Sequence, residues 1–259
     1  MKTHHRLVAV ASFAIFAAFT FVFEANAVPL GNQRIASFSE AKKLAVKLHN
    51  EHAITIYCPC KYQGKSIDLK SCGYQVHKDA KRAARLEWEH IVPAEAFGQS
   101  FSEWHVGAPE CHKKNGKAFK GRKCAEKNPE FERMEGDLYN LWPIVGELNG
   151  LRSNFSMAEI AGEGLTFGGC EAKIQNRKFE PMAEYKGIVA RDYLYMDLNY
   201  PGHGIISDKN RKLFAAWDRA HPVSAWECRR ASLIETLQGN ANQILKARCS
   251  ESKFTNTAP

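Results

Sequence analysis

Two short segments of the sequence concentrate residue types that can carry out hydrolysis. One runs from Arg85 to Pro93 and reads R-L-E-W-E-H-I-V-P, and the other runs from residue 135 to residue 155. The Glu89 carboxylate and the Asn149 amide offer oxygen ligands of the kind that Mg²⁺ prefers, and Mg²⁺ often takes one or two ligands from protein. Histidine titrates near neutrality, so His90 can act as a general base. These groups match phosphodiester hydrolysis, in which a base activates water and a hard cation neutralises charge on the phosphate.

Glu89 and His90 are neighbours on a predicted strand, which sets a geometric condition. Neighbouring strand residues point to opposite faces, so the two side chains can share a site if the strand bends or ends there, or if the phosphate reaches round. Pro93 makes a strand end at this point reasonable.

The same residue types leave other assignments open. Asn140 and Asn154 can supply an amide oxygen as well as Asn149 can, and chemistry does not rank the three. Glu89 and His90 can also form a buried polar pair without a catalytic role. A zinc protease is disfavoured because the sequence lacks the H-E-x-x-H motif.

The N-terminal segment is typical of a secretory signal peptide. Lys2 and Arg6 precede an apolar run that ends at Phe23, and Glu24-Ala25-Asn26-Ala27 follows. This pattern predicts cleavage after Ala27. An uncleaved anchor is the alternative, but the run is shorter than the roughly 20 apolar residues of a membrane span. We expect residues 1–27 to be a signal peptide, residues 28–259 to form the domain without membrane attachment, and a periplasmic or secreted location.

The chain is basic, and part of the charge is concentrated in one segment. The net charge is +8, or +7 without residues 1–27. Charge alone does not distinguish a soluble basic protein from one that binds a polyanion. Between the two segments described above, six of eleven residues are basic, namely Lys113, Lys114, Lys117, Lys120, Arg122 and Lys123. An isolated run of this kind is more often a solvated loop, but its position favours binding to a phosphate backbone.

The eight cysteines indicate disulfide bonds, because their number is even and the chain is predicted to enter an oxidising compartment. Zinc binding would call for paired C-x₂-C units, and the C-P-C spacing at 58–60 does not provide one. Two pairs are favoured as short local loops, a third is plausible, and the fourth uses the remaining cysteines: Cys111–Cys124, Cys228–Cys249, Cys60–Cys72 and Cys58–Cys170.

Capping residues and hydrophobic periodicity predict the elements that position these groups. Helices are expected at 39–50, 78–85, 128–136, 186–198, 207–220, 223–237 and 241–248, strands at 53–58 and 86–92, and a loop over 98–127. Pro143 is expected to open a helix that ends near Gly150. The sequence shows no internal repeat and no linker. The predicted fold is therefore one α+β domain with more helix than strand.

The motifs resemble those of the bacterial endonuclease I family of periplasmic and secreted nucleases. The similar motifs are E-W-E-H-x-V-P at 87–93, M-E-x-D-L at 134–138, N-L-x-P at 140–143 and G-E-x-N-G-x-R-S-N-F at 146–155. Further similar stretches extend the resemblance from Ile35 to Cys249. The resemblance implies a ββα-metal nuclease motif inside a mixed fold held by disulfides.

The resemblance also assigns roles to residues. It implies that Glu89 and Asn149 bind the metal and that His90 is the general base. It places Glu135 near the active site, and Arg122 is the nearest match to an arginine that contacts the scissile phosphate, although its spacing is shifted by one. The chain departs from the family pattern at Tyr139 and Leu151, where the family usually has His and Asp, and in a longer stretch between residues 90 and 124.

The predicted function is metal-dependent cleavage of DNA and RNA with little sequence preference, by a monomer that uses Mg²⁺ or Mn²⁺. His90 would take a proton from water, while Mg²⁺ on Glu89 and Asn149 would stabilise the transition state and give 5′-phosphate ends. Arg122 or Arg152 would add positive charge, and Arg152 would also bind nucleic acid. Glu135, Asn140 and Asn154 are candidate supporting residues. The alternative is a catalytically inactive exported DNA-binding protein.

Overall fold

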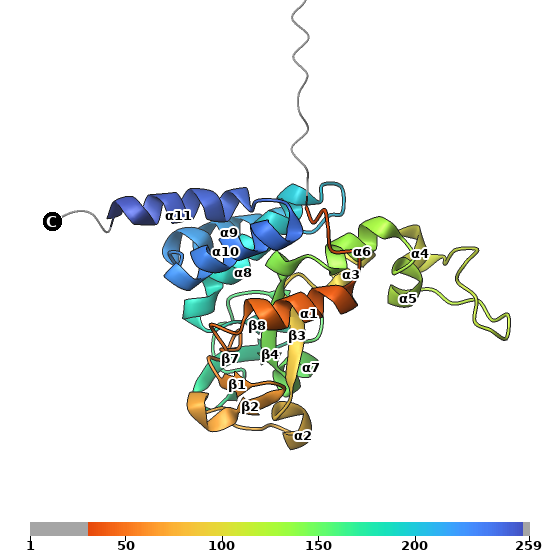
Figure 1. The fold of residues 1–259 in the computed structure, drawn as a ribbon. Coiled ribbons are helices and arrows are strands. Elements are labelled where there is room, and N and C mark those ends of the chain that lie inside the picture. The colour runs from red at the N-terminus through yellow and green to blue at the C-terminus, as the bar shows by residue number, and fades with distance from the viewer. Residues whose placement is uncertain (1–30, 256–259) are drawn as a thin grey trace, which may run out of the picture.

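The computed structural model describes residues 31–255, so the predicted signal peptide lies outside the described range. Within this range the fold mixes helices and strands (Figure 1), which confirms the predicted α+β class. The helices are α1 Phe38–Leu48, α2 Ala80–Ala83, α3 Ala94–Gly98, α4 Ser102–His105, α5 Arg122–Ala125, α6 Pro129–Glu135, α7 Gly146–Arg152, α8 Ala183–Asn199, α9 Asp208–Ala220, α10 Ala225–Gln238 and α11 Gln243–Thr255. Over the same residues, no helix combines the length and the apolar character that crossing a membrane requires.

In the part of the chain that the structure describes, the strands are short and form three separate sheets. Their bounds are β1 Lys61–Gln63, β2 Ser66–Asp68, β3 Leu86–His90, β4 Leu141–Val145, β5 Ser156–Met157, β6 Leu165–Phe167, β7 Cys170–Gln175 and β8 Lys178–Glu180, with the 3₁₀ turns η1 Leu69–Cys72 and η2 Leu138–Asn140 between them. β1 pairs with β2, β3 pairs with β4, and the remaining strands lie in the order β5-β8-β7-β6. The pair β3–β4 matters most here, because both predicted catalytic segments run through it.

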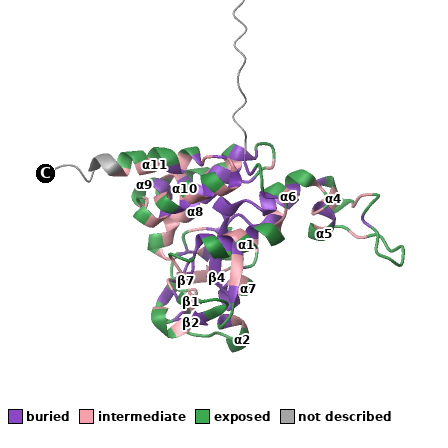
Figure 2. Ribbon diagram, in the orientation of Figure 1, coloured by how far each residue is buried: buried purple, intermediate pink, exposed green. Residues whose placement is uncertain are grey.

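The β3–β4 pair and helix α7 form a compact ββα unit. The two strands are antiparallel and pair from Leu86 with Val145 to His90 with Leu141. Every residue of β4 is buried, and α7 follows β4 directly and contacts both strands. Figure 2 shows this buried strand at the centre of the molecule, with exposed residues on the surrounding helices. The core therefore holds the elements that carry the two segments.

Pro143 does not open a helix, which corrects the prediction. It lies in β4 opposite Trp88, and its carbonyl oxygen accepts a hydrogen bond from the Ile56 main-chain nitrogen at 2.7 Å. The helix begins three residues later at Gly146 and continues through Gly150. A Cβ atom at Gly150 would lie 2.0 Å from the Arg82 guanidinium, so this glycine makes room for a side chain rather than ending the helix.

The strand predicted at 53–58 is also wrong. Ile54 makes a single bridge to Lys61, and the chain then folds back, so that the Thr55 main-chain nitrogen donates to the Cys60 carbonyl at 3.0 Å. Tyr57 has a φ of 69°, a conformation that interrupts an extended strand. The two cysteines beyond it bridge to different partners, which holds the reversal in place.

The sheet formed by β5 to β8 has no counterpart among the predicted elements. Its strands are two to six residues long, which is too short for alternation to stand out in the sequence. β7 turns into β8 at Asn176 and Arg177, whose φ angles of 49° and 58° suit a two-residue hairpin turn. The usual sequence signal for that turn is Asn-Gly or Asp-Gly, so the Asn-Arg pair did not predict a hairpin.

Several other expectations hold. The helices predicted in the C-terminal third correspond to α8–α11, and the helix predicted at 39–50 corresponds to α1, where the Ser37 side chain accepts from the Glu40 main-chain nitrogen. Within the stretch predicted as loop, α4 and α5 are short helices and residues 106–121 have no helix or strand. The four predicted disulfides are all formed, namely Cys58–Cys170, Cys60–Cys72, Cys111–Cys124 and Cys228–Cys249.

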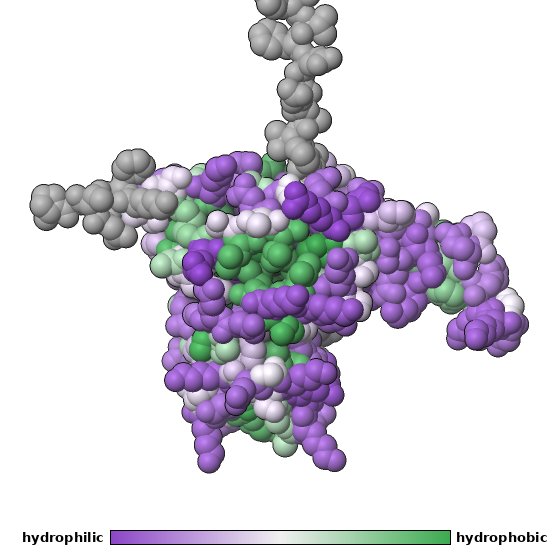
Figure 3. Space-filling view, in the orientation of Figure 1, coloured by the Kyte–Doolittle hydropathy of each residue, from purple (hydrophilic) through white to green (hydrophobic). Residues whose placement is uncertain are grey.

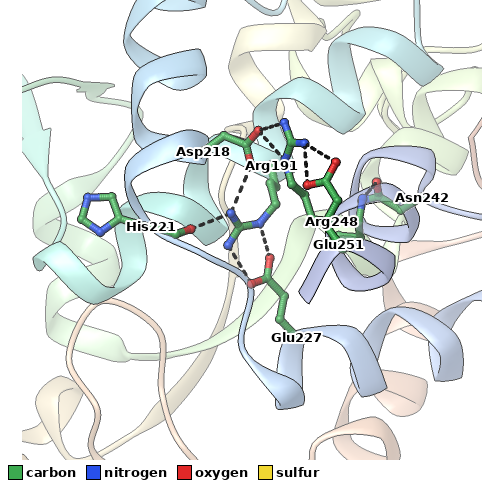
Figure 4. Close-up of polar contacts among 8 residues, drawn as sticks. Arg191, Asp218, His221, Glu227, Asn242, Arg248 and Glu251 are labelled. Atoms are coloured by element: carbon green, nitrogen blue, oxygen red, sulfur yellow. Dashed lines mark hydrogen bonds and ion pairs between the residues drawn. The ribbon is translucent and has the colours of Figure 1, made fainter. Parts of the chain in front are cut away.

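Buried ion pairs tie the C-terminal helices together (Figure 4). The Arg191 guanidinium on α8 donates to both carboxylate oxygens of Glu227 on α10, at 2.7 and 2.8 Å. It also donates to Asp218 on α9 at 3.2 Å, and Arg248 on α11 donates to the same aspartate at 2.8 Å. Because each buried charge meets opposite charge and hydrogen-bond partners, the network holds four helices in one arrangement.

Candidate active site

A cavity of about 470 Å³ opens where β3 ends, and residues of both predicted segments line it. Its polar lining includes Glu89, His90, Asn149, Arg122, Arg152 and Asn154, and Phe38, Trp88 and Trp104 supply apolar walls. Because His90 is the last residue of β3, the alternation of faces stops at this point. Glu89 and His90 therefore both reach the same cavity, which satisfies the geometric condition set by the sequence.

The His90 imidazole is fixed in one orientation. Its Nε2 atom donates to the main-chain carbonyl oxygen of Glu135 at 2.7 Å, and its ring packs against Phe38 with ring centroids 4.8 Å apart. A proton on Nε2 leaves Nδ1 as the atom with a free lone pair. Burial, and next the positive charge of Arg122, lower the pKa of His90 to about 3, so the ring is neutral near pH 7 and can accept a proton.

The Glu89 carboxylate is buried against one positive charge. The Arg152 Nη1 atom lies 2.9 Å from Glu89 Oε1, yet Oε1 accepts no hydrogen bond of good geometry. Burial raises the pKa of Glu89 to about 7, while the charge of Arg152 opposes the rise. A further cation at the cavity would therefore favour the ionised carboxylate.

Glu87 orients the Asn149 side chain. The Asn149 amide donates from Nδ2 to Glu87 Oε2 at 2.9 Å. Arg82 and Arg85 both form ion pairs with the Glu87 carboxylate. With Nδ2 committed to Glu87, the Oδ1 atom of Asn149 is the one left for the cavity. The sequence offered Glu87 as part of a motif, but nothing in the motif indicated this orienting contact.

The donor atoms suit a hard cation with few protein ligands. Carboxylate and amide oxygens, of the kind that Glu89 and Asn149 offer here, are the ligand types that Mg²⁺ takes while keeping several waters. Across residues 31–255, no group of three or more His, Cys, Asp or Glu side chains is placed to hold a metal ion. The donor set at Glu89 and Asn149 therefore fits Mg²⁺ better than a metal that needs a full protein cage.

Arg122 and Glu135 contact each other beside His90. The Arg122 Nε atom donates to the Glu135 carboxylate, and its guanidinium lies over the Phe38 ring at 5.4 Å from the centroid. The Arg122 side chain remains 41% exposed, so its outer nitrogens can meet a phosphate at the mouth of the cavity. Glu135 is buried and has two roles. Its carboxylate accepts a hydrogen bond from Arg122, and its main-chain carbonyl oxygen accepts one from His90.

Three further candidate residues differ in how they relate to the cavity. Asn140 binds the main chain of Val92 through both amide atoms, at 2.7 and 3.0 Å, and is not part of the cavity lining. Asn154 lines the cavity and donates to Glu95 at 2.7 Å. Arg152 lines the cavity but is 1% exposed and is held by main-chain carbonyl oxygens, so it would have to leave these acceptors to contact nucleic acid.

The basic residues at 113–123 belong mainly to a projecting loop. We name residues 106–121, between α4 and α5, the basic arm. It extends away from the body of the molecule (Figure 1), and its surface is largely hydrophilic (Figure 3). Lys113, Lys114, Lys117 and Lys120 are exposed on it, and the Cys111–Cys124 bridge closes its base. Lys123 lies just beyond the arm on α5 and pairs with Glu126 at 2.7 Å.

Two antiparallel strands, a following helix, and a histidine, a carboxylate and an amide gathered at one cavity define a nuclease of the ββα class. The comparisons with known proteins agree. A family model, Endonuclease I, matches residues 32–248, and the chain belongs to this family.

Three relatives share about two fifths of their aligned residues with the chain. A periplasmic deoxyribonuclease of Aeromonas hydrophila is 40% identical over 229 residues, which cover 85% of this chain and 90% of the relative. An extracellular deoxyribonuclease of the same organism is 40% identical over 220 residues, with 82% and 90% covered. Endonuclease-1 of Buchnera aphidicola is 38% identical over 221 residues, with 83% and 82% covered. The periplasmic and extracellular relatives confirm the exported location predicted from the sequence.

Proposed function

We propose that the protein is a Mg²⁺-dependent endonuclease that cleaves DNA, and also RNA, with little sequence preference and leaves 5′-phosphate ends. The observation that supports this most strongly is the meeting of Glu89, His90 and Asn149 at one cavity. The names of the Aeromonas relatives support DNA as a substrate. Nothing in the cavity lining is specific for deoxyribose, so RNA is included in the proposal.

His90 performs the proton transfer in this mechanism. Its Nδ1 atom takes a proton from a water molecule, and the resulting imidazolium keeps its Nε2–H bond to the Glu135 carbonyl, which holds the ring in place. Glu89 and Asn149 hold the cation, which when bound neutralises charge on the phosphate and on the leaving oxygen. Arg122 adds positive charge at the cavity mouth, where a phosphate oxygen gains charge in the transition state.

The basic arm contributes binding rather than chemistry. Its lysines are exposed and project beyond the cavity, so they suit contacts to backbone phosphates on either side of the cleavage point. Phosphate contacts carry no direct sequence information, which accounts for weak sequence preference. We propose that one molecule acts alone, because the groups that we assign to catalysis all come from one chain.

Incubation of the purified protein with supercoiled plasmid, in Mg²⁺ or in excess chelator, tests this proposal. We expect nicking and then degradation in Mg²⁺, recovery of chelated enzyme by Mg²⁺ or Mn²⁺, and little cleavage with Ca²⁺, because its looser coordination positions the phosphate and water poorly. Enzymatic end-labelling of the products should detect 5′-phosphates. Tight DNA binding without cleavage under every metal condition would instead establish the alternative, an inactive DNA-binding protein.

A further inference from the structure

The Arg152 guanidinium lies at the end of β3 and contacts both Glu89 and His90. Nη1 lies 2.9 Å from the Glu89 carboxylate and donates to the His90 carbonyl oxygen at 3.1 Å. Nη2 donates to the carbonyl oxygen of Ile91 at 2.6 Å. One side chain therefore binds the proposed metal-binding carboxylate and the main chain of the general base at the same time.

Arg152 also belongs to the helix that carries the other proposed metal ligand. It is the last residue of α7, and Asn149 lies three positions earlier on the same helix, so the two side chains project from nearly the same face. A guanidinium that binds the β3 terminus consequently fixes the distance between α7 and β3. That distance sets the separation of the Asn149 amide from the Glu89 carboxylate.

Burial argues against a direct role for Arg152 at the substrate. Its side chain is 1% exposed, and that of Glu89 is 5% exposed. The nearby Tyr57 and Tyr193 are buried as well and interact with Arg152. A guanidinium enclosed in this way would have to give up four protein acceptors to reach a phosphate, since Nη1 also donates to the Ser153 carbonyl oxygen at 3.3 Å. Arg122, with its partly exposed guanidinium, is the arginine placed to do so.

We propose that Arg152 is a positioning residue, which locks Glu89 and the His90 main chain against α7 so that Glu89 and Asn149 form a cation site before the cation arrives. This inference rests on the proposed function, because it concerns the same metal site. It predicts that loss of the guanidinium impairs metal binding even when no nucleic acid is present. Partners that orient metal ligands typically change metal affinity or activity by about 10- to 100-fold when they are replaced.

Mn²⁺ binding to purified protein without nucleic acid, followed by electron paramagnetic resonance, tests the inference. Arg152→Met should bind Mn²⁺ at least about tenfold more weakly than the wild type. Arg152→Lys should also be weakened, because one ammonium cannot reproduce a planar fork that reaches four acceptors from two nitrogens. Arg191→Met is the matched control: it also removes a buried guanidinium paired with carboxylates (Figure 4). Arg191 does not line the cavity, so this variant should leave Mn²⁺ affinity within about twofold.

Kinetics separate positioning from phosphate contact. A positioning role predicts a lower kcat in the Arg152 variants with little change in the KM for DNA, whereas loss of a phosphate contact would raise the KM. A folded Arg152→Met or Arg152→Lys protein that binds Mn²⁺ as the wild type does would overturn the inference. If wild-type protein itself binds no Mn²⁺ and cleaves in chelator, the proposed metal dependence fails instead, which is a different result.

A structure of the wild-type protein with Mn²⁺ provides a readout that does not depend on how well the variants fold. We expect the Arg152 guanidinium to keep its contacts with Glu89 and with the carbonyl oxygens of His90 and Ile91, while both proposed ligands contact the ion. A guanidinium that had moved away from these acceptors toward solvent or a phosphate would contradict the proposal.

Discussion

The His90 side chain donates to the main-chain carbonyl of Glu135, a residue 45 positions away at the end of α6. Because the acceptor is a main-chain atom, the contact depends on where α6 ends rather than on the residue type at position 135. The Glu135 side chain is then free to receive Arg122. A single residue thus sets both the tautomer of the base and the position of the arginine beside it.

Replacement of His90 by alanine should remove nearly all cleavage and leave DNA binding largely intact. A positioned general base typically contributes about 100- to 10,000-fold to a rate, so a loss in this range is expected. Plasmid nicking and a DNA-binding titration in Ca²⁺ measure the two properties separately. His105→Ala, at an exposed histidine on α4, is the control. A His90→Ala enzyme within a few-fold of wild type would exclude the proposed role.

Neutralisation of the basic arm should reduce the salt dependence of DNA binding. Log affinity falls with log salt by about 0.9 per duplex phosphate neutralised, so replacing Lys113, Lys117 and Lys120 with Gln should flatten the slope by up to about 3 units. Turnover at saturating DNA should change much less. Binding isotherms at several salt concentrations provide the measurement.

Two controls make the arm experiment specific. Lys123→Gln should have a small effect, because that lysine already pairs with Glu126. The triple replacement of Lys209, Lys212 and Lys246 removes the same charge from exposed positions on α9 and α11. If both triple variants flatten the slope equally, the arm has no special role and is a solvated loop.

Gly146→Ala should destabilise the fold, although alanine usually favours a helix over glycine by about 1 kcal/mol. A Cβ atom at this position would lie 2.5 Å from the Arg82 carbonyl oxygen and 2.8 Å from that of Arg85. These are main-chain atoms, so relief requires movement of α7 away from α2 and the residue before β3, at a cost of about 1 to 3 kcal/mol. Urea unfolding should show a smaller loss for Gly150→Ala, whose clash is with the flexible end of Arg82. A Gly146→Ala protein as stable as wild type would show that the helix shifts freely.

His49 should make the protein less stable below neutral pH. It is 1% exposed, and burial, followed by the charge of Arg230, lowers its pKa well below the ordinary value of 6.5. His49 therefore takes up a proton near pH 6.5 in the unfolded chain but stays neutral in the folded chain. The free energy of unfolding falls as the pH drops through that value. A single such group contributes a loss of about 2 kcal/mol between about pH 8 and pH 5. His49→Gln should fall less steeply in chemical unfolding across this range, and equal slopes would contradict the assignment.

The sequence predicts the candidate catalytic residues but not the contacts that hold them in place. Glu89, His90 and Asn149 stand in recognisable motifs, and the structure brings them to one cavity. The acceptor for His90 is a main-chain oxygen, which a residue type cannot reveal. The burial of Arg152 was equally hidden, because an arginine beside two polar residues looks like a surface cation until α7 is docked on β3.

The fold was predictable where local signals agree with tertiary packing. The capped helix α1 and the C-terminal helices show both, and the α+β class follows from them. The helix predicted to begin at Pro143 was wrong because a proline can open a helix or lie in a strand. The contacts that place it in a strand are with Trp88 and Ile56, which are distant in sequence. The strand predicted before Cys58 failed because two bridges, rather than β propensity, determine the path of the chain there.

The Cys58–Cys170 bridge joins residues 112 positions apart. Glu89, His90, α7 and the basic arm all lie between these two cysteines in the sequence. A chain that emerges from its N-terminus into an oxidising compartment can close this bridge only after residue 170 has arrived. The segments that carry the proposed catalytic residues have then already entered that compartment. The order of the cysteines along the chain therefore makes this bridge a late step, which can follow only after β3, β4, α7 and the basic arm have entered the oxidising compartment.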